Sequence, residues 1–189
     1  MKNIFLGIAM SSLVLAACNN NRQTGSDTKD TVANTNSKIT ETKKVSAVDA
    51  VTKDYLKLKN ALVEDNDQLA AEAGKSLVNS LGAVDKTSLS TEQAKVFEDI
   101  NADAKEHAEH IGSNVGNIKH QREHFETLSG EIYDLLKVDK ATGQKLYYDN
   151  CPMYNKGKGG NWISETKEVK NPYYGKSMLD CGSVKDELN

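Results

Sequence analysis

The sequence predicts a mainly α-helical protein, an up-and-down four-helix bundle with a short irregular or β-structured C-terminal tail packed on it. Four segments within residues 46–138 carry apolar side chains at helical spacing. The connections between these segments are short, which favours antiparallel neighbouring helices. From residue 146 the helical pattern fades, and glycine, aromatic residues and both prolines concentrate in the tail, residues 146–189. We therefore expect one helical domain over residues 46–189.

The overall composition excludes two classes of protein. The chain has 189 residues, which is enough for one domain of ordinary size. Its 24 basic and 27 acidic side chains give a net charge of −3, so the chain has no general attraction for nucleic acid. The one long apolar run lies at the N-terminus and is too short to span a bilayer comfortably. We therefore expect neither a nucleic-acid-binding protein nor a multi-spanning membrane protein.

The first 17 residues are typical of a bacterial lipoprotein signal peptide. Lys2 supplies the positive charge, residues 4–15 form a short apolar run, and Leu15-Ala16-Ala17-Cys18 resembles the lipobox. We therefore expect Cys18 to be lipidated, the alternative being an ordinary secretory signal peptide with a chance cysteine. Asn19 replaces the aspartate that marks retention at the inner membrane, so an outer-membrane lipoprotein that faces the periplasm is the better prediction.

Residues 18–45 predict a disordered tether behind the lipidated cysteine. Few of these residues are apolar, so they cannot bury enough surface to offset the entropy of ordering. A flexible chain of this length spans roughly 28 Å. The tether would keep the folded domain near the membrane without placing it in the bilayer.

The first two helices are predicted at about residues 46–64 and 67–82. Ser46 followed by Asp49 is a helix start signal, and Gly82 is a plausible helix end. Apolar side chains at strict four-residue spacing mark the buried face of the second helix. They are Leu69, Ala73, Leu77 and Leu81.

The third and fourth helices are predicted from Ser90 to about Ile111 and over residues 117–138. Gln93 follows Ser90 in capping-box register. Residues 112–117 are rich in turn-forming residues, although one long bent helix through this stretch is an alternative.

All the histidines of the chain fall within 18 residues of one another on the third and fourth predicted helices. They are His107, His110, His120 and His124. At 100° per residue, His107 lies about 50° and His124 about 75° from the centre of its apolar stripe, while the other two lie about 110° away or more. An antiparallel turn would gather all four imidazoles near one end of the bundle.

This spacing favours two interpretations. Histidines three or four residues apart share one side of a helix and can bind one metal ion together. The alternative is that they are solvated side chains that pair with the neighbouring glutamates Glu106, Glu109 or Glu123.

Residues 120–124 also match the H-x-x-E-H pattern of a class of zinc peptidases, in which His120 and His124 would bind zinc and Glu123 would activate water. A five-residue pattern is weakly specific, and the 65 residues that follow contain no evident second catalytic segment. The chain also lacks a G-x-S-x-G motif and a phosphate-binding glycine-rich loop. We therefore expect that the protein is not an enzyme.

Two cysteines in the tail, Cys151 and Cys181, would lie in an oxidising compartment. The default expectation is a disulfide that closes a loop of about 30 residues and stabilises the fold by roughly 3–4 kcal/mol. Met153 and Met178 flank the two cysteines, so the alternative is a site of two thiolates and two thioethers, a donor set that selects Cu(I).

Elsewhere in the tail, extended segments are expected at residues 147–148 and 167–169, and a loop at residues 156–160. Large aromatic side chains are available to dock the tail on the bundle. They are Trp162, Tyr173 and Tyr174.

The tail and the fourth helix together resemble a known family. The segments that carry the resemblance are CPM, KGKGGNWIS and VKNPYYGKSMLDCG in the tail and IKHQREHFETLSGEIYDLL upstream. Over about residues 47–186 they look like the bacterial domain of unknown function 3347. Members of that family are lipoproteins or secreted proteins, and the domain also occurs fused to periplasmic adaptors of heavy-metal efflux pumps. The resemblance implies a role in handling copper or silver.

The function that we expect is therefore soft-metal binding at the cell envelope. The protein would bind Cu(I) or Ag(I) as a buffer, a sensor or a donor to an efflux adaptor, with the membrane contacted through the N-terminal lipid. The predicted ligands are the four tail sulfurs of Cys151, Met153, Met178 and Cys181, then His107 and His124, and after these His110 and His120. The alternative is an envelope interaction module without metal, stapled by the Cys151–Cys181 disulfide.

Overall fold

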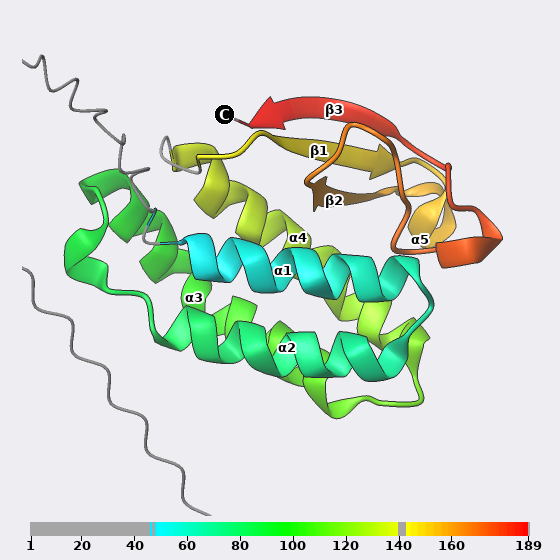
Figure 1. Cartoon of the computed structure of the whole chain (residues 1–189), viewed down its shortest axis with the longest axis horizontal. Helices are drawn as coiled ribbons and strands as arrows, with labels where there is room; N and C mark the ends of the chain where they lie inside the picture. The colour runs from blue at the N-terminus through cyan, green and yellow to red at the C-terminus, as the bar shows by residue number, and fades with distance from the viewer. Residues whose placement is uncertain (1–45, 47, 140–142, 189) are drawn as a thin grey trace, which may run out of the picture. The chain divides into compact units, whose positions relative to one another are not determined.

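Four long helices form the body of the protein in the computed structural model, which describes residues 46, 48–139 and 143–188. The helices are α1 (Asp49–Val63), α2 (Asp67–Gly82), α3 (Thr91–Ser113) and α4 (Ile118–Val138). Each helix packs on the next one along the chain, as Figure 1 shows. The predicted four-helix bundle is confirmed.

The helix ends follow the capping signals in the sequence. The Ser90 hydroxyl accepts a hydrogen bond from the Gln93 backbone N–H, and the Gln93 side chain accepts one from the Ser90 backbone N–H, so the predicted capping box is present. Between α3 and α4, Gly116 adopts a φ of +86° and the Asn117 side chain caps α4. The chain therefore turns here, and the alternative of one long bent helix is wrong.

The core lies along the inner stripes of the helices, with one exception in α2. Leu77 and Leu81 are buried as predicted, but Leu69, at the start of the stripe, is 46% exposed. Farther along, α2 and α3 approach closely at Gly74, where a Cβ atom would lie only 2.9 Å from the Ala108 carbonyl oxygen. A side chain at this position would force the two helices apart.

The tail is a small antiparallel sheet with the strand order β2-β1-β3. Its strands are β1 (Leu146–Cys151), β2 (Gly160–Ser164) and β3 (Ser183–Leu188), and the short turns α5 (Tyr154–Gly157) and η2 (Gly175–Ser177) lie between strands. The expectation of a strand at 147–148 is confirmed. No strand forms at 167–169, because residues 167 and 168 lie in a bend. The loop expected at 156–160 contains the end of α5 and the start of β2.

The sheet packs on the bundle mainly through β2, which contacts α4 and α1 (Figure 1). Trp162 is fully buried and Tyr173 nearly so, as expected for docking residues. The Tyr55 hydroxyl of α1 lies 2.7 Å from the Ser129 hydroxyl of α4 and accepts a 3.1 Å hydrogen bond from the Ile163 backbone N–H. This phenol therefore joins two helices to the sheet.

Charged side chains reinforce the contact between bundle and tail. The ammonium group of Lys59 is almost fully buried and lies 2.8 Å from Oε2 of Glu165, whose other oxygen accepts a hydrogen bond from the Asn60 side chain. Arg122 of α4 donates to the Leu62 and Pro172 carbonyl oxygens at 2.8 and 2.7 Å. It also donates to the Asp65 carboxylate at 2.6 Å, which lowers the pKa of that carboxyl although burial opposes the shift. Arg122 thus connects three segments that are distant in the sequence.

One buried carboxylate lies between the sheet and α1. Asp149 of β1 has no solvent exposure, and neither of its oxygens accepts a hydrogen bond from any described residue. Its burial raises the pKa of the carboxyl to about 6, and the positive charge of Lys59 only partly opposes this.

The predicted signal peptide (residues 1–17), the lipidated Cys18 and the tether (residues 18–45) lie outside the described residues. Of the helices in the described part of the chain, none combines the length and the apolar character needed to cross a membrane.

Candidate metal centre

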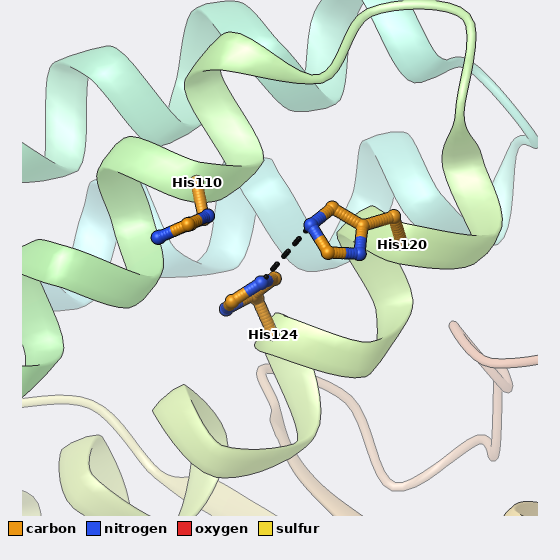
Figure 2. Close-up of side chains that lie close together, drawn as sticks. All are labelled: His110, His120 and His124. Atoms are coloured by element: carbon orange, nitrogen blue, oxygen red, sulfur yellow. Dashed lines mark hydrogen bonds between the residues drawn. The ribbon is translucent and has the colours of Figure 1, made fainter.

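The seam between α3 and α4 brings the histidines together. His107 and His110 lie one turn apart on α3, and His120 and His124 lie one turn apart on α4. Because the two helices are antiparallel, the C-terminal half of α3 faces the N-terminal half of α4. Figure 2 shows His110 of α3 above His120 and His124 of α4. All four imidazoles gather at one end of the bundle.

Three of these imidazoles have the spacing of a metal site. One nitrogen of each of His110, His120 and His124 lies within 4.8 Å of the others. The Nε2 atoms of His120 and His124 lie 3.2 Å apart (Figure 2). Two nitrogen ligands at the usual 2.0–2.1 Å from a tetrahedral ion are separated by about 3.3–3.4 Å. The pair could therefore bind one ion with little rearrangement.

The rings of His110 and His124 are stacked, with centroids 4.3 Å apart and an angle of 10° between the ring planes. His110 is exposed and offers one of its nitrogens to the same group of three.

His107 lies beside this group rather than in it. Its Nδ1 atom is 3.0 Å from Nδ1 of His124, and its Nε2 atom is 4.0 Å from Oε1 of Glu131. The second oxygen of Glu131 is buried and accepts no hydrogen bond within the described residues. Burial, followed by the charge of Asp103, raises the pKa of the Glu131 carboxyl to about 7. His107 therefore contacts a ligand candidate on one side and a carboxyl group on the other.

The surroundings favour the neutral form of the more central imidazoles. Burial is the main cause that lowers the pKa of His107, although the charges of Glu106 and Asp103 oppose the shift. Burial also lowers the pKa of His124, and repulsion from His110, His120 and His107 adds to the effect. Because a metal ion binds the neutral imidazole, little free energy is needed to deprotonate these side chains near pH 7.

Glu123, the acidic residue of the H-x-x-E-H pattern, contacts its own neighbour on the helix. Its carboxylate lies 3.4 Å from Nδ1 of His120. In this arrangement the carboxylate can accept a hydrogen bond from the Nδ1–H group of His120 and so orient that ring.

The two tail cysteines also meet. Their Sγ atoms lie 2.7 Å apart, with Cys151 buried and Cys181 partly exposed, and no bond joins them in this structure. The hydrogen bond to Cys151 and then burial raise the pKa of the Cys181 thiol to about 11. The structure thus brings together the two residues of the predicted disulfide, and the bond itself stays a prediction.

The methionines of the predicted sulfur site are exposed, Met153 by 53% and Met178 by 37%. The Met153 carbonyl accepts from the Tyr174 hydroxyl, and the Met178 carbonyl accepts from the Cys181 backbone N–H. Among the described residues, no group of three or more histidine, cysteine or carboxylate ligands includes either cysteine. The four-sulfur site therefore stays a prediction, and the imidazole group has the stronger geometry.

Glu131 is a residue of this region that the sequence pattern does not single out. A usable signal was present, because Glu131 follows His124 by seven residues and so lies on the same face of α4. Its burial beside His107 depends on how α3 and α4 pack, which the sequence pattern does not give.

Comparison with known proteins identifies a family. Residues 51–144 match the family described as "Protein of unknown function (DUF3347)". No curated protein and no solved structure matches the chain. The matched segment contains all four histidines and ends before β1, so the match does not extend to the cysteine-bearing tail.

Proposed function

We propose, for a chain that belongs to the DUF3347 family of proteins of unknown function, that it binds a transition-metal ion at the seam between α3 and α4. The ligands are His110, His120 and His124. The observation that carries this proposal is the approach of their three nitrogens to within 4.8 Å of one another. Neutral imidazoles are good ligands for copper, zinc and nickel and poor ligands for magnesium or calcium.

Copper is the metal that we favour. Among divalent ions of the first transition row, Cu²⁺ binds nitrogen ligands most tightly. The thiols and thioethers of the tail, predicted as soft ligands, select Cu(I). Copper therefore suits both sets of side chains, and it also agrees with the metal-handling role that the family resemblance implies.

The site suits exchange of the ion rather than permanent storage. Three protein ligands leave a coordination position open, and the side chain of His110 is exposed. An ion bound in this way can be reached by a second protein. We therefore favour a periplasm-facing lipoprotein that acts as a copper buffer, sensor or donor to an efflux adaptor.

A competition titration tests the proposal. The full chain, without a histidine tag, is titrated with Cu²⁺ and Zn²⁺ against a chromophoric chelator. The variant His110→Ala/His120→Ala/His124→Ala is expected to bind at least 100-fold more weakly, because it loses all three nitrogen ligands. The variant Cys151→Ser/Cys181→Ser is the matched control and should keep the wild-type affinity for Cu²⁺.

The proposal is wrong if the triple histidine variant binds both ions as tightly as the wild type does. A parallel titration of the reduced protein with Cu(I) tests the sulfur ligands. If Met153→Ala/Met178→Ala leaves the Cu(I) affinity unchanged, the thioethers do not take part in binding.

The contact between the tail sulfurs favours a second candidate function, an envelope interaction module stapled by a disulfide. This candidate predicts that the protein, purified from an oxidising compartment and denatured without reductant, contains no reactive thiol at positions 151 and 181. It also predicts little change in stability when copper is added. Thiol counting by mass, after alkylation of the denatured protein, distinguishes two free thiols from one disulfide.

A further inference from the structure

His124 uses both of its ring nitrogens, and this restricts how it can bind a metal. Its Nε2 atom faces Nε2 of His120 at 3.2 Å, and its Nδ1 atom faces Nδ1 of His107 at 3.0 Å. A neutral imidazole carries one proton. An ion bound between His120 and His124 takes the lone pair of Nε2 on each ring, so the proton of His124 must be on Nδ1, directed at His107.

The same reasoning fixes the tautomer of His107. To accept the proton of His124, Nδ1 of His107 must present a lone pair, so His107 carries its own proton on Nε2. That nitrogen is the one that faces Oε1 of Glu131, at 4.0 Å. Glu131 also has a buried oxygen that accepts no hydrogen bond from the described residues, so it has free capacity as an acceptor. His124 and His107 are within hydrogen-bond distance of each other, and Glu131 lies next in the same donor-to-acceptor order, at a separation from His107 that is longer than a hydrogen bond.

We infer that His107 is a positioning residue, which holds His124 in the tautomer that presents Nε2 to the metal, and that Glu131 holds His107 in turn. This inference rests on the proposed metal site and names its supporting residues. Metal-binding histidines commonly donate their second ring proton to a carboxylate or another acceptor, and loss of that partner typically weakens metal binding 10- to 100-fold. His107 thus has a role different from that of a fourth ligand.

A pair of substitutions at His107 tests the inference by metal affinity. His107→Leu removes the acceptor and is expected to bind Zn²⁺ 10- to 100-fold more weakly than the wild type. His107→Asn keeps an oxygen near the position of Nδ1 and should restore most of the affinity. Glu109→Gln, on the exposed face of the same helix, is the control and should bind like the wild type.

Glu131→Met gives an independent measurement. If Glu131 acts through His107, the double variant with His107→Leu should bind no more weakly than His107→Leu alone, because both changes break the same chain of contacts. Independent roles would instead give additive losses. Circular dichroism of each apo variant separates weaker binding from loss of folding.

Nitrogen-15 NMR of the histidine rings supplies a readout that a general loss of packing does not produce. In the zinc-loaded full chain, His124 is expected to carry its proton on Nδ1 and the metal on Nε2. Metal on Nδ1 of His124, or equal zinc affinity in His107→Leu and the wild type, would overturn the inference.

These outcomes are distinct from failure of the proposed function. If the triple histidine variant binds zinc as the wild type does, both the metal site and this inference are wrong. If the triple variant loses binding and His107→Leu does not, the metal site stands and only the positioning role is wrong.

Discussion

Replacement of Arg122 by methionine is expected to lower the free energy of unfolding by about 3–5 kcal/mol. Methionine keeps much of the apolar stem but leaves the Leu62 and Pro172 carbonyl oxygens without their donor. It also leaves the Asp65 carboxylate without its ion pair. Urea denaturation at neutral pH, followed by circular dichroism, measures the change.

Two other variants serve as references for Arg122→Met. Arg122→Lys keeps the charge but lacks the planar fork that reaches several acceptors, so it should recover only part of the loss. Lys119→Met changes an exposed residue of the same helix and should shift the stability by no more than about 0.5 kcal/mol. If Arg122→Met unfolds at the same urea concentration as Lys119→Met, Arg122 does not hold the tail to the bundle.

Replacement of Asp149 by asparagine is expected to stabilise the protein near neutral pH by about 1–3 kcal/mol. The pKa of this carboxyl is raised from 3.8 to about 6 in the folded protein. Between these two values the folded state binds more protons at position 149 than the unfolded state does. The contribution of Asp149 to stability therefore falls as the pH rises through this window, and the ionised form destabilises the fold above pH 6. Lys59 keeps its ion pair with Glu165 in the variant.

The measurement is the difference in free energy of unfolding between Asp149→Asn and the wild type at several pH values from 3.5 to 8. The difference should be smallest near pH 3.5, where the carboxyl is largely neutral in both states, and should grow until about pH 7. Asp180→Asn, at an exposed position, should give no such rise. A difference that does not change with pH would mean that the Asp149 carboxyl has the same pKa in the folded and unfolded states, and a difference that falls as the pH rises would mean that the folded protein stabilises its charge.

The helical part of the fold could be predicted because its signals are local. Ser90 and Gln93 form the capping box that their spacing indicates, and the turn at Gly116 follows from residues that disfavour helix. The sheet was harder to predict. Strand β3 is mostly exposed and polar, so it shows little apolar alternation. Its position depends on pairing with β1, which is distant in the sequence. The burial of Asp149 likewise depends on this pairing and on α1.

The clustering of the four histidines could be predicted from the sequence, but the choice of the three that have metal-site spacing could not. Helical spacing and an antiparallel turn were sufficient to place four imidazoles near one another. When the histidines are ranked as metal ligands by their angle from the apolar stripe, His107 comes first. The group of three whose nitrogens have the spacing of a metal site contains His110 instead. The reason is that the stripe of α3 faces the centre of the bundle, while the seam with α4 lies at the edge of that stripe. His110 and His120, which lie well outside the stripe centres, therefore still meet His124 across the seam.

The contacts of Tyr55 and Lys59 determine where this protein can be divided. The family match ends at residue 144, yet the Tyr55 hydroxyl and the Lys59 ammonium both find partners at residues 163–165. A fragment that ends at residue 144 would keep both side chains and lose those partners. The Lys59 ammonium group would then have no carboxylate to compensate its charge. Expression of this domain for biophysical work therefore requires the sheet as well as the helices, and the boundary of sequence similarity is not the boundary of the cooperative unit.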